Sequence, residues 1–162
     1  MVVTMKHKRI LAWLLCLILV VALAGCFRNQ SSMPFNGEIT FHQIKVTIPA
    51  EFIRDSSQSN EDVWLFEQGW YKKTIVLLHR AIQEDAAAYI GAYAQGLQTQ
   101  GISSEATTFM GVPAAMSTAT RENGVFWQEL SFAMDGVFYA VALNGGTETE
   151  FRALLDSISI AA

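Results

Sequence analysis

Residues 103–143, SSEATTFMGVPAAMSTATRENGVFWQELSFAMDGVFYAVAL, contain four stretches of β-strand composition separated by three turn signals. The turn signals are Gly111-Val112-Pro113, Glu122-Asn123-Gly124 and Asp135-Gly136. Asn-Gly and Asp-Gly favour tight hairpin turns, because the central residues of such turns need positive φ. The segment therefore predicts an antiparallel meander with strands at 103–109, 114–120, 125–134 and 137–143.

Strand patterns also precede this segment. Residues 39–41 and 43–48 alternate between apolar and polar side chains, and residues 63–68 and 73–82 read as a hairpin across residues 69–72. The strand at 73–82 has apolar side chains on both faces, Ile75 and Leu77 on one and Val76 and Leu78 on the other. We therefore expect it to lie inside the sheet rather than at its edge.

Two segments have the spacing of amphipathic helices. In the first, predicted at about 84–100, apolar residues recur every three or four positions: Ala86, Tyr89, Ile90, Tyr93, Ala94 and Leu97. Glu84 and Asp85 suit its positive N-terminal end, and Gly101 suits its C-terminal cap. Thr147 and Glu150 form a capping-box pattern that opens a second helix. The order of elements predicts an α+β fold, an antiparallel β-sheet with two helices packed on it.

This arrangement resembles the PsbP-like superfamily over about residues 39–160. The resemblance rests on Val46-Thr47-Ile48-Pro49 at the end of an early strand, on Gly111-Val112-Pro113-Ala114 between two strands, and on a short helix ending near Ser157-Ile158. It implies a PsbP-like α/β sandwich. The superfamily includes lipid-anchored bacterial proteins, photosystem assembly factors and an import factor, and it shares no catalytic residues. The resemblance therefore implies no catalytic residue here.

The N-terminal region has the pattern of a secretory leader. Lys6, Lys8 and Arg9 precede an uncharged run at residues 10–23, and Leu23-Ala24-Gly25-Cys26 follows. These four residues resemble the lipobox of bacterial lipoproteins, which implies cleavage before Cys26 and acylation, palmitate included, of its thiol. We expect a signal peptide at 1–25, a lipidated Cys26 with a flexible tether at 26–38, and the domain at 39–162.

Two alternatives to lipidation stay open. An uncleaved membrane helix would use the uncharged run at 10–27, which has 18 residues and lies near the lower limit for spanning a bilayer. Ordinary signal peptidase would remove Cys26 altogether, although Leu23 fits its A-x-A site poorly. Lipidation predicts a protein held at the cell membrane and exposed on its extracytoplasmic side.

The charge and cysteine content limit the possible partners. Residues 26–162 carry 8 basic and 15 acidic side chains, a net charge of −7. This balance argues against nucleic acid as a partner, because phosphate backbones bind basic surfaces. Cys26 is the single cysteine after the leader, so an internal disulfide is excluded.

No motif predicts catalysis. A metal site would have to unite His42 and His79 with a carboxylate such as Glu84 or Asp85, and their spacing matches no metal motif. No G-x-S-x-G sequence occurs, and Ser56, Ser57 and Ser59 suit a polar turn. We expect a protein that is not an enzyme and has no metal or cofactor.

One aromatic pair predicts a contact surface. Trp70 and Tyr71 fall in a predicted turn beside Lys72 and Lys73, and such a tip can touch a partner protein or the lipid interface. The alternative is that both rings fold back over the edge of the sandwich. Trp64 and Trp127 lie inside predicted strands, where we expect core positions.

These observations favour a lipid-anchored, non-catalytic envelope protein that binds or helps to assemble another envelope protein. The first alternative is a lipoprotein that binds a small molecule or a metal. The second is a hydrolase, which requires a reactive serine or histidine site.

Overall fold

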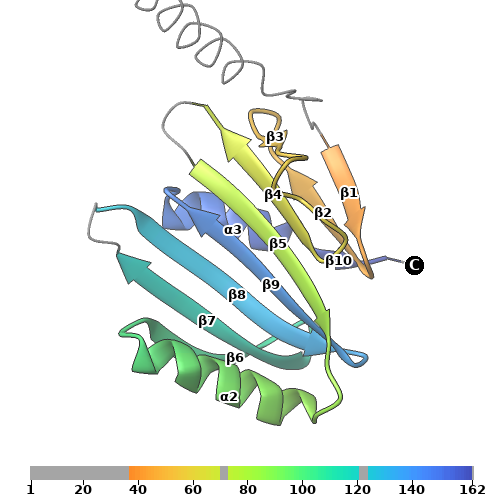
Figure 1. Ribbon diagram of the computed structural model, residues 1–162, viewed down its shortest axis with the longest axis vertical. Helices are drawn as coiled ribbons and strands as arrows, with labels where there is room; N and C mark the ends of the chain where they lie inside the picture. The colour runs from red at the N-terminus through yellow and green to blue at the C-terminus, as the bar shows by residue number, and fades with distance from the viewer. Residues whose placement is uncertain (1–36, 70–72, 121–123, 162) are drawn as a thin grey trace, which may run out of the picture. The chain divides into compact units, whose positions relative to one another are not determined.

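The computed structural model describes residues 37–69, 73–120 and 124–161 (Figure 1). These ranges contain ten strands and two helices: β1 (Gly37–Phe41), β2 (Ile44–Ile48), β3 (Ile53–Arg54), β4 (Val63–Gln68), β5 (Lys73–Ala81), α2 (Ala86–Thr99), β6 (Ser103–Phe109), β7 (Val112–Thr120), β8 (Phe126–Met134), β9 (Val137–Asn144), α3 (Glu148–Asp156) and β10 (Ser159–Ile160).

The main sheet is antiparallel and has seven strands in the order β3-β4-β5-β9-β8-β7-β6. It confirms the predicted meander at β6–β9 and the hairpin of β4 and β5. Strand β5 is internal, as predicted, because it pairs with β4 on one side and β9 on the other. The α+β fold class is confirmed.

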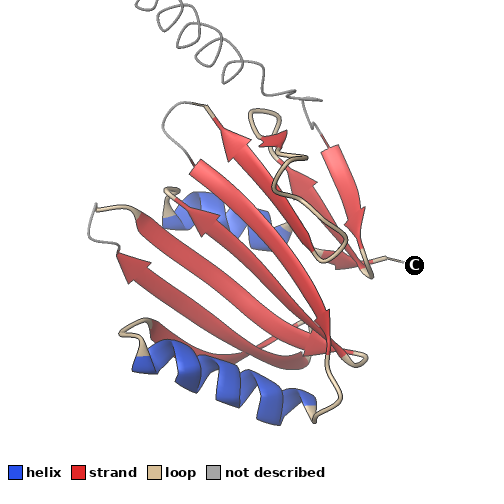
Figure 2. Cartoon of the chain, viewed as in Figure 1, coloured by secondary structure: helices blue, strands red, loops and turns tan. Residues whose placement is uncertain are grey.

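The first hairpin forms a sheet of its own. β1 and β10 pair with the two edges of β2 and make a separate three-stranded sheet. This small sheet and α3 cover one face of the main sheet, while α2 packs on the opposite face (Figure 2).

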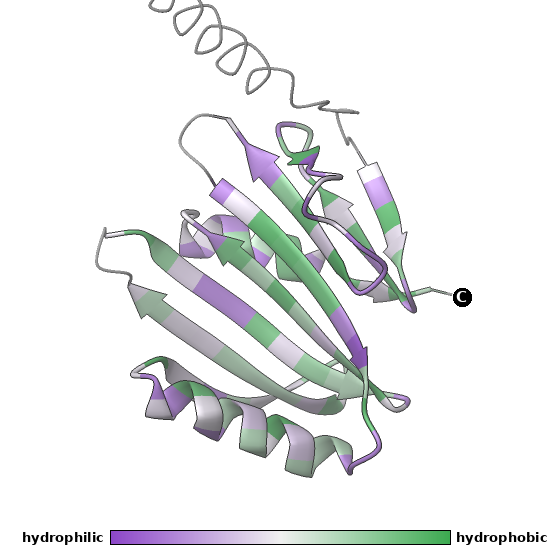
Figure 3. Cartoon of the chain, in the orientation of Figure 1, coloured by the Kyte–Doolittle hydropathy of each residue, from purple (hydrophilic) through white to green (hydrophobic). Residues whose placement is uncertain are grey.

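The main sheet is therefore covered from both sides, and each side has its own apolar core. The larger core lies between the main sheet, the small sheet and α3, and includes Ile44, Phe66, Phe132, Tyr139 and Phe151. The smaller core lies under α2 and is built from small residues and one ring: Ile90, Ala94, Ala115, Ala133, Phe138 and Ala140. Figure 3 shows the resulting runs of hydrophobic residues along the middle of β5 and along β9, the central strands of the sheet.

One predicted turn is wrong by two residues. The β6–β7 turn consists of Met110 and Gly111, both with positive φ (53° and 80°), and β7 already begins at Val112. Pro113 therefore lies in a strand. It precedes the first β7–β8 residue pair, Ala114 with Phe132, so its missing N–H removes no hydrogen bond to β8.

Two tryptophans were predicted to lie in the core. Trp64 packs against the larger core, and the Arg54 guanidinium lies 3.9 Å from the centre of its ring. Trp127 differs from the prediction: it is only half-buried and belongs to neither core. Its side chain lies on the α2 face of the sheet, beyond the part that the helix covers.

Candidate functional site

The predicted contact residues are only partly described. Cys26, Trp70, Tyr71 and Lys72 lie outside the described residues. Lys73 is the first residue of β5, and its Nζ lies 2.6 Å from Glu150 Oε1 of α3. The lysine therefore connects the end of the β4–β5 hairpin to the first turn of a helix.

The predicted capping box at the start of α3 is present. The Thr147 hydroxyl accepts a hydrogen bond from the Glu150 backbone N–H at 3.2 Å, and Glu150 Oε2 accepts one from the Thr147 N–H at 2.7 Å. The hydrogen bond from Lys73 and those from Thr147 lower the pKa of Glu150 to about 2. Glu150 is thus a fixed anionic group at the start of the helix.

A pocket of about 230 Å³ lies directly beside Glu150. It is enclosed by the end of β2, the segment after it, β5, β9 and α3. Its interior is apolar, with Phe52, Ile75, Leu143 and Leu154, and the polar lining residues are Thr47, Glu51, Glu150 and Ser157.

The local sequence explains how this pocket forms. Pro49 follows β2, and a turn in which the Phe52 N–H donates to the Pro49 carbonyl at 3.0 Å brings the Phe52 ring into the core. On the opposite wall, the Ser157 hydroxyl donates to the Leu154 carbonyl at 2.6 Å and accepts from the Thr47 N–H at 3.1 Å. These bonds hold α3 against β2.

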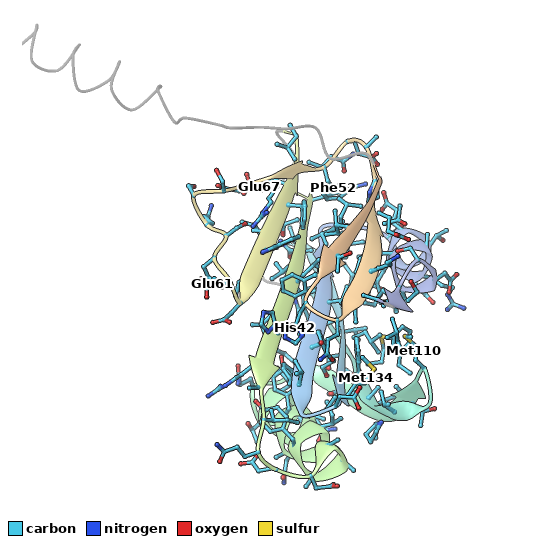
Figure 4. The ribbon with its side chains drawn as sticks, turned by 90° about the vertical axis from the view of Figure 1, so that its right-hand side faces the viewer. His42, Phe52, Glu61, Glu67, Met110 and Met134 are labelled. Carbon is cyan, nitrogen blue, oxygen red and sulfur yellow. The ribbon has the colours of Figure 1, made fainter. Side chains whose placement is uncertain are left out.

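His42, in the β1–β2 turn, and His79 of β5 lie against each other. Figure 4 shows His42 well below Phe52, which lines the pocket. The two histidine rings stack with centres 4.5 Å apart, and His42 Nδ1 lies 2.8 Å from the Tyr139 hydroxyl. Asp85, one of the carboxylates considered for a metal site, instead caps α2 by accepting from the Ala88 N–H. In the described part of the chain, no three metal-binding side chains form a group that could hold a metal.

No protein-family model matches the chain, and no curated protein matches it either. Among solved structures, it is similar to the solution structure of cyanobacterial PsbP (CyanoP) from Synechocystis sp. PCC 6803. The TM-score is 0.55 at 10% sequence identity, over 80% of this chain and 95% of that chain. The fold is PsbP-like.

A crystal structure of a protein from Bacteroides thetaiotaomicron VPI-5482 is similar to the same degree, with a TM-score of 0.54 and 10% identity. The match covers 79% of this chain and 49% of the Bacteroides protein, so this chain spans about half the length of that protein. Within the described ranges, neither α2 nor α3 has the length and apolarity that crossing a bilayer requires.

No local sequence pattern predicts the pocket. Its lining residues come from segments around residues 47–52, 75, 143 and 150–157, which are distant along the chain. The capping box predicted where α3 begins, but only the packing of α3 against β2 places that helix end beside Phe52. A pocket built from such long-range contacts leaves no local pattern.

Proposed function

We propose that this chain is a lipid-anchored, extracytoplasmic accessory protein whose PsbP-like domain binds another envelope protein and catalyses no reaction. The observation that carries the proposal is the apolar pocket beside α3. In this view, an apolar side chain of the partner enters the pocket, and the polar groups around the mouth contact the partner's backbone.

The volume of the pocket supports a side chain as its occupant. Sites for small molecules usually have roughly 300–1,000 Å³, and this pocket has about 230 Å³. Protein interfaces often depend on one large side chain held in a desolvated pocket of the other partner. Leucine, methionine and phenylalanine combine an apolar surface with a size suited to this space.

The position of the pocket supports a partner at the membrane surface. Gly37 pairs with Ile48, and Thr47 and Pro49 line the pocket, so the chain leaves the domain towards Cys26 beside the pocket. The eleven residues from 26 to 36 can extend over at most about 40 Å. A lipid on Cys26 would therefore keep the pocket near the bilayer.

The polar groups around the pocket support a binding role rather than catalysis. Ser157 holds α3 to β2 through its hydroxyl, and Glu150 is engaged by Lys73 and Thr147. Both side chains already serve the fold. A hydrolase reading would need one of them to change partners before it could act on a substrate.

The test fills the pocket by a substitution and measures which proteins no longer copurify with the chain. Ala153 lines the pocket from the exposed side of α3, so Ala153→Trp should fill it without disturbing the core. Arg152→Trp places the same ring on the same helix at an exposed position that does not line the pocket, and is the matched control. Each full-length variant is captured from membranes in mild detergent and analysed by quantitative mass spectrometry.

We expect one or more envelope proteins to be captured with the unmodified chain and with Arg152→Trp, and to be lost with Ala153→Trp. Equal recovery with both tryptophan variants would contradict the role of the pocket. A different result would be that no protein is captured, and that an apolar small molecule copurifies with the unmodified chain but not with Ala153→Trp. In that case the small-molecule alternative replaces this proposal.

The anchor is tested separately. Metabolic labelling with an alkyne analogue of palmitate should label the unmodified chain, and Cys26→Ser should remove both the label and the membrane association. A chain that stays on the membrane without the label would support an uncleaved helix. An unlabelled chain that begins after Cys26 would instead support ordinary signal peptidase.

A further inference from the structure

The face of the main sheet that carries α2 is covered by a helix over only part of its width. α2 packs on β6, β7 and part of β8, and the core beneath it reaches Phe138 and Ala140 of β9 and Leu78 of β5. Over β4 and the remaining parts of β5, β8 and β9, this face carries neither of the two described helices (Figure 1). Three large side chains on this open part are half-buried: Leu65, Val76 and Trp127. The surface lies on the opposite side of the sheet from the pocket.

A carboxyl group lies at the border of this open part, where the edge of α2 reaches it. Glu129 of β8 is only 7% exposed, and its Oε1 accepts a hydrogen bond from the Tyr93 hydroxyl at 2.7 Å. Burial raises the pKa of Glu129. A carboxylate can accept about four hydrogen bonds, and among the described residues Tyr93 is the one side chain seen to donate to it.

A second hydrogen-bond acceptor lies next to the first. Asn144 Oδ1 of β9 is buried and has no hydrogen-bond partner among the described residues. Asn144 pairs with Trp127, and Ala142, two residues earlier in β9, pairs with Glu129. Glu129, Trp127 and Asn144 therefore share one face on two adjacent strands.

Among the residues that the structure describes, no lysine or arginine forms an ion pair with Glu129 or a hydrogen bond with Asn144 Oδ1. Arg80 is the charged residue that β5 places on this face, and it pairs with Phe138, which pairs with Ala133. It therefore lies four residues along β8 from Glu129. Glu67 of β4 pairs with Thr74 on the same face and adds negative charge.

The geometry points to a binding site for the guanidinium group of an arginine side chain, presented by a partner protein, over Glu129, Asn144 and Trp127. The planar guanidinium has five N–H donors, which match two oxygen acceptors, and it stacks favourably on an aromatic ring. The apolar side chains of Leu65 and Val76 suit the methylene groups of arginine. The net charge of −7 on residues 26–162 favours a basic partner.

This inference does not depend on the pocket, so its test uses different residues. The full-length chain in detergent micelles is labelled with ¹³C at the glutamate carboxyl carbons and titrated with acetyl-arginine-amide. Glu129→Gln identifies the Glu129 signal by removing it. Acetyl-norleucine-amide, which has a similar apolar stem without charge, is the control ligand.

We expect acetyl-arginine-amide to shift the Glu129 signal and to lower the pKa read from it, while acetyl-norleucine-amide leaves both unchanged. Glu129→Gln should weaken arginine binding by roughly tenfold or more, because a charge-assisted hydrogen bond is lost. Trp127→Leu retains the carboxyl group and should weaken binding by roughly fivefold through loss of the ring.

An unmoved Glu129 signal at saturating acetyl-arginine-amide would overturn the inference. Equal responses to the two ligands would overturn it as well, because they would show an apolar surface without preference for a cation. Trp127→Leu keeps the test decisive if Glu129→Gln does not fold.

Discussion

Glu150 and Glu129 are two carboxyl groups of one domain in opposite environments. Glu150 is exposed at the start of α3, where a lysine and a helix cap favour its charge. Glu129 is buried in the main sheet, where the apolar surroundings disfavour its charge. The two groups therefore change stability in opposite directions as the pH changes.

For Glu150, the pKa falls from its ordinary 4.5 to about 2 on folding. A lowered pKa contributes stability above pH 4.5, and this contribution is lost as the pH falls towards 2. Glu150→Gln should flatten this part of the pH profile. At pH 7 it should cost about 1 kcal/mol or less, because the ion pair is exposed to solvent.

Urea unfolding followed by circular dichroism between pH 2 and pH 7 measures this effect. Glu148→Gln is the matched control, because Glu148 lies in the same helical turn and pairs with the exposed Arg152 outside the capping box. A loss of stability at pH 7 as large for the control as for Glu150→Gln would contradict the prediction.

For Glu129, the pKa rises above its ordinary 4.5 because the group is buried. A raised pKa means that stability is complete below pH 4.5 and declines as the pH rises through the folded-state value. Glu129→Gln should abolish this decline and leave the domain at least as stable at pH 8. Urea unfolding at pH values from 4 to 8 tests this prediction. If the stability of Glu129→Gln declined with rising pH as much as that of the unmodified chain, another group would be responsible for the decline.

At this scale, the sequence was informative where neighbours along the chain decide the chemistry. The capping role of Glu150 was predictable, because Thr147 lies three residues away. The partner Lys73 was predicted to belong to an exposed tip, and its ion pair with Glu150 depends on the fold. The burial of Glu129 was not predictable, because it requires Tyr93 of a distant helix to lie above it.

Two glycines show how differently two elements tolerate a methyl group. Gly146, just before α3, is buried, and an added Cβ would lie 2.7 Å from Leu143 Cγ. Leu143 lines the pocket, so the methyl group would displace a pocket wall. Gly91 lies inside α2 on its exposed side, and no atom outside the helix lies within 4 Å of the position of its Cβ.

Gly146→Ala should destabilise the domain by about 1–3 kcal/mol, because the surrounding core is already filled. Gly91→Ala should stabilise it by about 0.5–1 kcal/mol, because alanine loses less entropy in a helix. Thermal unfolding of the two variants side by side measures both effects. If both variants shifted the melting temperature in the same direction, then either Gly146 would not be tightly packed or Gly91 would not be on an open helix surface.

Element types were predictable where turns or periodicity mark them. The β8–β9 turn at Asp135 and Gly136 has positive φ at both residues, as the Asp-Gly sequence indicates. The spacing of apolar residues predicted α2, which begins at Ala86, one residue after its N-cap Asp85. β3 and β10 have two residues each and carry no pattern of their own, so they form only because neighbouring strands present free edges.

The layers of the described domain are held together by apolar cores and by several polar contacts, one of which lies between the small sheet and the main sheet. Tyr139 of β9 is buried in the larger core, and its hydroxyl contacts His42 in the β1–β2 turn. His42 in turn stacks on His79 of β5. This group connects the small sheet to the main sheet.

Tyr139→Phe removes this connection without changing the ring, and should cost about 1 kcal/mol. A double-mutant cycle with His42→Ala isolates the pair, and its coupling energy should also be about 1 kcal/mol. Denaturant unfolding of the four proteins provides the measurement. A coupling energy of zero would mean that the hydroxyl and the imidazole do not interact in solution.

The arrangement of the layers was the least predictable feature. The element order indicated the α+β class, because a helix follows one hairpin and another follows the meander. Nothing in residues 37–48 indicates that β1 and β2 leave the main sheet, since their alternation suits either sheet. Their place depends on contacts that are distant along the chain: β2 pairs with β10 from the other end of the domain, and Ile44, Val46 and Ile48 pack in the larger core.

The pairing of β2 with β10 also determines the order in which the domain can be completed. Ile44 pairs with Ile160, and the Thr47 N–H donates to a hydroxyl 110 residues further along the chain, in Ser157. Contacts across so much sequence form late in folding, because the intervening loop must first be shortened by local structure. The meander can form early, whereas β1 and β2 wait for the residues near 160. The first strands of the domain along the sequence are therefore among the last to be built into the fold.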